Sequence, residues 1–188
     1  MENLLIYKLR KNSEHLYGLS DEVIAALILD MLKINESYKI VPIVNVARSF
    51  DFVILKKELN SGLAGIMSVG ENKGLAKTMW VNESDDKFMQ RVVVARMLAN
   101  YLEALKNNRS EKGMQMHDNI SHENIFQEHE AFILNILAPD KMFLKQYMIA
   151  TTEFDEALIE YSDLVYRYLQ DCFNVTEEFV YRKVRSLF

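Results

Sequence analysis

The strongest constraint on the fold is a long stretch with a helical apolar period, at residues 85–106. Apolar side chains recur there every three or four residues, a spacing that places them along one face of an α-helix. They are Phe88, Val92, Val93, Ala95, Leu98, Ala99, Leu102 and Leu105. The run Val92-Val93-Val94 is β-branched and favours a strand locally, so burial has to stabilise the helix there. We therefore predict a long helix that is buried within the fold.

The sequence around this helix alternates between helical and strand-like patterns. One helix is predicted to begin at Ser20 and continue through Leu32, and a short one is predicted from Pro42 to Phe50. Apolar runs at residues 52–55, 63–67 and 75–81, separated by Gly, Asn and Lys, predict three short strands. Residues 107–119 are polar and predict a mobile loop. Helices are predicted again over residues 121–137, 154–172 and 176–187. The expected fold class is α+β, mostly helical with a small three-stranded sheet.

Composition limits both the compartment and the partners of the chain. With 188 residues, 49% of them hydrophobic, the chain is long enough for one compact domain with a buried core. Its formal net charge of −5 opposes a phosphate backbone, so nucleic-acid binding is disfavoured. Cys172 is the only cysteine, which fits a reducing compartment. The amino terminus lacks a signal-peptide pattern, and no apolar run approaches the ~20 residues of a membrane span. We expect a cytoplasmic protein without membrane contact.

The histidines are the first candidates for a metal site, but their spacing is unfavourable. None of the four forms the i, i+4 pair of an H-E-x-x-H zinc site. They are His15, His117, His122 and His129. His122 and His129 are seven residues apart and could share a helix face, where exposed polar residues are the simpler interpretation. An active hydrolase that uses a non-standard metal set remains an alternative. Its ligands would be His117, His122, His129 and Glu128.

Several stretches resemble, in order, the ImmA/IrrE metallopeptidase family. Residues 41–47, VPIVNVA, are similar to the family's opening helix, and residues 80–82, WVN, are similar to its last strand. Residues 91–102, RVVVARMLANYL, are similar to its active-site helix, R-F-T-L-A-H-E-L-G-H-Y-L. The matching positions are Arg91, Ala95, Leu98, Tyr101 and Leu102. The resemblance implies a zincin-like minimal peptidase fold over residues 1–150, with Leu98 facing the core. It also implies a carboxyl-terminal segment with helix-turn-helix-like helices, residues 151–188, packed on that fold.

The positions that carry the chemistry of this family are replaced in the chain. Arg96 and Asn100 stand where two zinc-binding histidines would be, and Met97 stands where the glutamate general base would be. A zincin needs neutral imidazoles for the metal and a carboxylate that takes a proton from metal-bound water. A guanidinium stays protonated, an amide is a poor zinc ligand and a thioether does not accept that proton. The resemblance therefore implies a vestigial site without a metal, a cofactor or catalytic residues.

The third zinc ligand of the family corresponds to Glu128. Residues 128–139, EHEAFILNILAP, are similar to the family's helix E-A-N-x-F-A-x-x-L-L-M-P when the two are aligned on the proline, and Glu130 offers a competing register. Without a metal, a buried carboxylate requires another cation. We therefore predict a partly buried ion pair between Arg96 and Glu128, or Glu130 in the other register. We expect Asn100 to lie beside the pair and to satisfy its leftover donors or acceptors.

The function implied by the resemblance is that of a pseudoenzyme that binds a protein. Members of the family cleave or antagonise a helix-turn-helix repressor encoded beside them, often in phages or mobile elements. The implied partner is such a regulator, which the chain would regulate or antagonise. DNA binding through the carboxyl-terminal cations Arg182, Lys183 and Arg185 remains a second alternative. Glu177 and Glu178 at the start of the same helix oppose it, because their charges would face phosphates.

Overall fold

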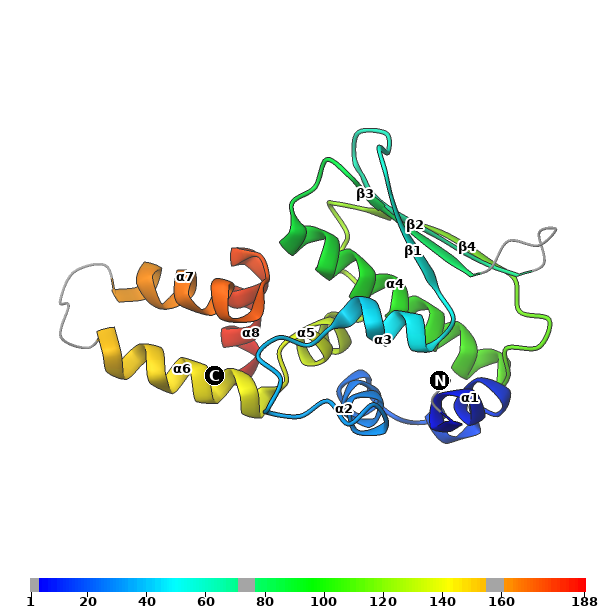
Figure 1. Ribbon diagram of the computed structural model, residues 1–188, viewed down its shortest axis with the longest axis horizontal. Coiled ribbons are helices and arrows are strands. Elements are labelled where there is room, and N and C mark those ends of the chain that lie inside the picture. The colour runs from blue at the N-terminus through cyan, green and yellow to red at the C-terminus, as the bar shows by residue number, and fades with distance from the viewer. Residues whose placement is uncertain (1–3, 71–76, 155–160) are drawn as a thin grey trace.

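The computed structural model describes residues 4–70, 77–154 and 161–188, and these form an α+β fold (Figure 1). The helices and strands are α1 (Leu4–Lys11), α2 (Asp21–Met31), α3 (Ile43–Ser49), β1 (Val53–Lys57), β2 (Leu63–Val69), β3 (Thr78–Asn82), α4 (Lys87–Asn108), β4 (Met116–Ser121), α5 (Glu130–Leu137), α6 (Asp140–Phe154), α7 (Tyr161–Phe173) and α8 (Glu177–Leu187). The sheet lies over α4, and α6, α7 and α8 gather at the other end of the molecule (Figure 1). The expected fold class is confirmed.

The sheet has four strands instead of the predicted three, in the order β1-β3-β2-β4. β1 runs parallel to β3, whereas β2 runs antiparallel to both β3 and β4. The additional strand, β4, begins inside the predicted mobile loop, so that prediction is wrong over residues 116–119. β4 is an edge strand in which His117 and Asn119 are exposed while Ile120 is buried. An edge strand needs only one apolar face. Because most residues of β4 are polar, the apolar pattern of the sequence does not predict this strand.

The long predicted helix is α4, which packs against the sheet and is buried along most of its length (Figure 1). Asp86 caps it, because one carboxylate oxygen accepts a hydrogen bond from the Met89 amide at 2.7 Å. Leu98 is fully buried, as predicted. Helix and sheet lie close together at Gly65 in β2, where an added Cβ would lie 2.5 Å from Val93 Cγ1. A larger residue there would force the Val93 side chain to shift.

Several helix boundaries differ from the sequence-based expectation. The helix predicted over residues 121–137 is much shorter, because Ser121 ends β4 and α5 begins only at Glu130. His129, immediately before α5, has a left-handed backbone with a φ of 56°, through which a helix does not continue. α1 and α6 are helices that the apolar pattern does not predict. α7 begins at Tyr161. The helix predicted there starts earlier, and its residues 155–160 lie outside the described residues. Residues 75 and 76 of the third predicted strand also lie outside them.

The carboxyl-terminal helices form one end of the molecule. α6 packs against α7, and α8 packs against both α7 and α5. Phe143 of α6 and Phe173 of α7 are fully buried and stack, with ring centroids 5.4 Å apart. The division predicted between residues 150 and 151 lies inside α6. Neither these helices nor any other described helix is long and apolar enough to cross a membrane.

Candidate functional site

An ion pair joins Arg96 of α4 to Glu128 in the turn before α5, two of the predicted site residues. Arg96 Nη2 lies 2.5 Å from Glu128 Oε2, and Arg96 Nη1 donates a hydrogen bond to the main-chain oxygen of the same glutamate. The predicted ion pair is confirmed, in the register that places Glu128 beside Arg96. Glu130, the competing residue, instead pairs with Arg182 at 2.8 Å.

Burial of this ion pair is strongly asymmetric. The Arg96 side chain is 6% exposed, whereas the Glu128 side chain is 73% exposed. The guanidinium contacts the carboxylate through one nitrogen and a carbonyl through another, so the two groups do not form the parallel two-donor arrangement. Arg96 Nε is buried and has no hydrogen-bond partner among the described residues. The desolvation penalty therefore falls on the arginine, and the carboxylate stays in contact with solvent.

Asn100 lies one helical turn beyond Arg96, but it does not serve the ion pair. Its Nδ2 donates to Asp118 Oδ2 in β4, and its Oδ1 is buried with no partner within the described part of the chain. The expectation that Asn100 would satisfy leftover groups of Arg96 and Glu128 is therefore wrong. The reason is β4, since the unpredicted strand brings a carboxylate over this turn of α4.

Met97, at the position of the general base in the family, points into the apolar interior. It is fully buried, and a Cβ on Gly65 would lie 3.3 Å from the Met97 Cε, so the tip of the side chain packs directly against β2. The flexible thioether fills the space between helix and sheet. At this position the protein presents packing atoms, not a proton acceptor.

Two histidines of the alternative metal set, His122 and His129, bond different carboxylates. His122 Nε2 lies 2.9 Å from Asp85 Oδ1. His129 bridges two helices, with Nδ1 2.9 Å from Asp21 and Nε2 2.9 Å from Glu103. The hydrogen bond to Asp21 is the main cause that raises the pKa of His129 above its ordinary value.

The backbone around His122 and His129 is not helical. His122 and His129 do not share a helix face, because residues 122–129 form turns before α5. In the described residues, no group of three His, Cys, Asp or Glu side chains is arranged so that it could hold a metal ion.

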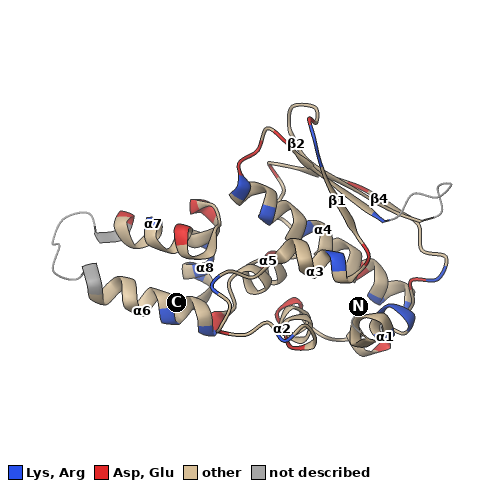
Figure 2. Ribbon diagram, in the orientation of Figure 1, with Lys and Arg blue, Asp and Glu red and all other residues tan. Residues whose placement is uncertain are grey.

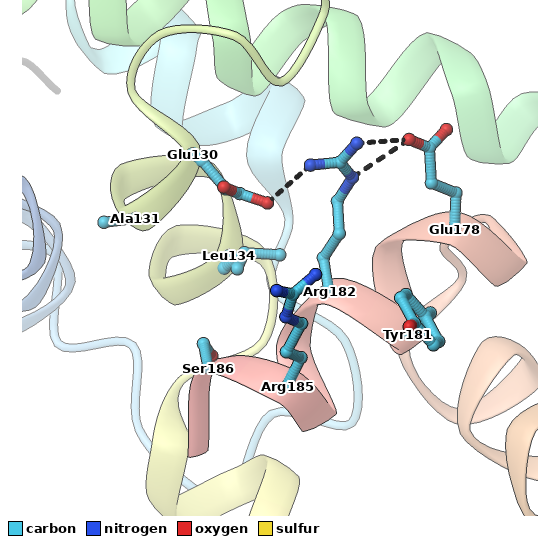
Figure 3. Close-up of a pocket in the computed structure, with 8 residues that line it drawn as sticks. All are labelled: Glu130, Ala131, Leu134, Glu178, Tyr181, Arg182, Arg185 and Ser186. Carbon is cyan, nitrogen blue, oxygen red and sulfur yellow. Dashed lines mark hydrogen bonds and ion pairs between the residues drawn. The ribbon is translucent and has the colours of Figure 1, made fainter. Parts of the chain in front are cut away.

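Two of the three carboxyl-terminal cations, Arg182 and Lys183, are engaged in ion pairs with carboxylates of the same chain. Arg182 extends between Glu130 and Glu178, to which it bonds at 2.8 and 2.7 Å (Figure 3). Lys183 is fully buried, and its Nζ donates to Asn135 Oδ1 at 2.9 Å and pairs with Asp140. Burial lowers the pKa of Lys183. These contacts leave Arg185 as the exposed cation of the three, beside a pocket of about 630 Å³ between α5 and α8 (Figure 3).

A second charged cluster, which sequence reasoning missed, surrounds Glu111. This carboxylate accepts hydrogen bonds from Arg10 Nε at 2.8 Å and from the Tyr101 hydroxyl at 2.7 Å, and it also pairs with Lys77. Burial raises the pKa of Glu111, but the hydrogen bonds from Lys77 and Tyr101 outweigh it and hold that pKa below its usual value. The cluster ties α1, α4 and the start of β3 to the segment before β4. No local pattern signals it, because its members are far apart in the sequence.

Comparison with known proteins gives no relative for this chain. No family model matches it, and no curated protein or solved structure is significantly similar to it.

Proposed function

We propose that this chain is a non-catalytic, metal-free relative of the ImmA/IrrE metallopeptidases that acts by binding another protein. The observation that carries the proposal is the ion pair between Arg96 and Glu128. The resemblance aligns both residues with zinc ligands. A guanidinium stays protonated and does not ligate a metal, and here it also engages the carboxylate of the third ligand position. The arginine thus supplies the positive charge that zinc supplies in the family.

Two further features support the proposal. Met97 packs against Gly65, so the residue aligned with the general base cannot take a proton from water. In addition, α3, the strands β1 to β3, α4 and α5 occur in the order that the resemblance implies, with the unpredicted strand β4 between α4 and α5. This order favours a zincin-like fold with a lost active site.

The alternatives draw less support from the contacts. A non-standard metal set would have to free His122 from Asp85 and His129 from its two carboxylates. DNA binding through α8 would have to use Arg182, which is half-buried and already paired with two carboxylates, and Lys183, which is fully buried and paired with Asp140. A protein partner is therefore favoured, and the resemblance makes it a helix-turn-helix regulator of a phage or mobile element.

Restoring the lost ligands tests the proposal. Arg96→His together with Asn100→His places two imidazoles one helical turn apart, beside Glu128, which is the ligand set of a zincin. Asp118, which already bonds residue 100, is available to orient the second imidazole. We expect the wild-type protein to contain no stoichiometric zinc and to melt at the same temperature with or without a chelator. The double variant should bind one zinc ion per chain and melt several degrees lower with chelator.

The matched control is Arg96→Gln with Asn100→Gln, which breaks the same contacts without adding a zinc ligand. Stoichiometric zinc in the wild-type protein would overturn the metal-free function. A folded double variant that binds no zinc would show that the alignment with the family helix is wrong. Binding is tested separately by affinity purification of the tagged chain from its host. We expect a helix-turn-helix regulator to co-purify intact, whereas a cleaved regulator would reveal an active peptidase.

A further inference from the structure

A groove separate from the vestigial site lies between α2, the segment that follows it and the junction of α5 with α6. Its volume is about 550 Å³, within the usual range for a binding pocket. Its apolar lining consists of Val23, Ala26, Leu29, Ile34, Pro139 and Met142. Part of this lining is accessible, since Val23 is 48% exposed and Ala26 is also exposed, whereas Leu29 and Met142 are buried. An apolar surface of this kind can bury a side chain from another molecule.

The exposed face of α2 forms one wall of the groove. Glu22, Ala26 and Asp30 follow one another at intervals of four residues, so they form a row along the helix. Because each residue advances the helix by 1.5 Å, this row is about 12 Å long. The wall therefore has an apolar centre with a carboxylate at each end, and its length matches two turns of a partner helix.

The charges around the groove are predominantly negative. Glu22, Asp30 and Glu36 line it, and in the described parts of the chain none of the three forms a salt bridge. Lys141 is the exposed cation of the lining, while the carboxylate of Asp140 is already paired with Lys183. Figure 2 shows acidic residues on α2 and at the neighbouring start of α6. A cation placed in this groove would meet three carboxylates that form no salt bridge within the described residues, although Glu22 also acts electrostatically on the buried Lys183.

A buried lysine of α8 fixes the wall opposite α2, which is the junction of α5 with α6. Lys183, which is fully buried, donates to Asn135 and pairs with Asp140, and both of these residues line the groove. These contacts tie the end of α5 and the start of α6 to α8. A wall fixed in this way loses little conformational freedom when a ligand binds.

We propose that this groove is a docking site for a protein segment that carries an apolar side chain flanked by lysine or arginine. The apolar lining accepts the side chain, and the unpaired carboxylates of Glu22, Asp30 and Glu36 attract the flanking cations. The same charges repel nucleic acid. This inference rests on the proposed binding function and adds to it the surface and the chemistry of the partner.

Selection of peptides from a phage-displayed random library on the full-length chain tests the proposal. We expect the enriched peptides to combine apolar residues with lysine or arginine, and their affinity to fall as salt is added. Ala26→Arg should abolish their binding, because it fills the groove with a like charge, while an exposed arginine is well tolerated in a helix. A triple variant, Glu22→Gln with Asp30→Asn and Glu36→Gln, should bind about tenfold more weakly, since each exposed pair contributes only a fraction of that factor.

The matched control neutralises three exposed carboxylates outside the groove, which are Glu83, Glu123 and Asp171. It should bind the peptides like the wild-type protein. Enrichment of peptides without basic residues, an absence of enrichment, or unchanged binding by Ala26→Arg would each overturn the proposal. Self-association of the wild-type chain that Ala26→Arg abolishes in sedimentation would show that a second copy occupies the groove, and would also overturn it. Stoichiometric zinc in the wild-type protein would refute only the proposed metal-free function, because zinc does not change the expected binding of peptides to this groove.

Discussion

Neutralising Glu128 should destabilise the protein more than removing Arg96, because the arginine is the buried member of the pair. Glu128→Gln keeps the shape of the side chain but leaves a guanidinium that is only 6% exposed without its counterion. Breaking a fully buried pair costs about 3–5 kcal/mol, and the 73% exposure of Glu128 reduces this value through solvent screening. We expect a loss of about 1–3 kcal/mol in the free energy of unfolding.

Arg96→Met should be much milder. It removes the buried charge together with the unpartnered Nε, and the carboxylate of Glu128 remains solvated. The expected loss is about 0–1 kcal/mol, since an apolar side chain of similar length replaces a charge that was costly to desolvate. The double variant should resemble Arg96→Met alone, because glutamine at position 128 strands no charge once the arginine is gone. The coupling energy of the cycle then equals the cost of Glu128→Gln in magnitude, about 1–3 kcal/mol.

Urea denaturation followed by circular dichroism measures all four corners of this cycle. Glu123→Gln is the control, because Glu123 is an exposed glutamate in the same segment and has no salt bridge among the described residues. It should change stability by no more than about 0.5 kcal/mol. Additive effects of the two substitutions would refute the ion pair. A loss of several kcal/mol in Arg96→Met would refute the asymmetry and mean that the arginine stabilises the fold through other contacts.

Three further outcomes are expected from the same kind of measurement. Leu98→Ala should cost about 2–5 kcal/mol in urea denaturation, because Leu98 is fully buried, and a negligible effect would mean that α4 faces another way. Gly65→Ala should cost about 1–3 kcal/mol, because the new Cβ would overlap Val93, and an unchanged melting temperature would contradict the close approach of β2 to α4. The pKa of His129 is raised in the folded protein, so its contribution is complete below the unfolded pKa of about 6.5 and is lost as pH rises through the folded pKa. The control is His129→Asn, because asparagine suits the left-handed backbone. The wild-type protein should exceed this variant in free energy of unfolding at low pH, and the difference should shrink as pH rises. The same difference at all pH values would argue against the carboxylate contacts.

Local patterns and residue chemistry predicted a useful part of the fold and the site. The apolar period of α4 and the short runs of β1, β2 and β3 are properties of neighbouring residues, so they are visible in the sequence. The pairing of Arg96 with Glu128 was predictable for a different reason. The resemblance placed the two residues together, and a buried carboxylate was expected to need a cation. The pair forms, but the structure corrects the reason, because Glu128 is 73% exposed and Arg96 is the buried partner.

Other features depend on elements that are distant in the sequence. Asn100 bonds Asp118 because β4 joins the sheet at its edge, and no pattern in the polar residues of that strand predicts this pairing. α5 begins late because His129 adopts a left-handed backbone, held between carboxylates of α2 and α4. Neither partner carboxylate is near His129 in the sequence.

The sequence by itself determined the long buried helix, the α+β class and the absence of an H-E-x-x-H pattern from that helix. Each of these follows from the identity and spacing of residues that are close along the chain. Only the tertiary structure decided which end of the ion pair is exposed, which carboxylate holds each histidine, and where a groove with unpaired acidic groups remains at the surface. Burial and charge pairing are set by the elements that pack around a residue, and those elements come from the whole chain.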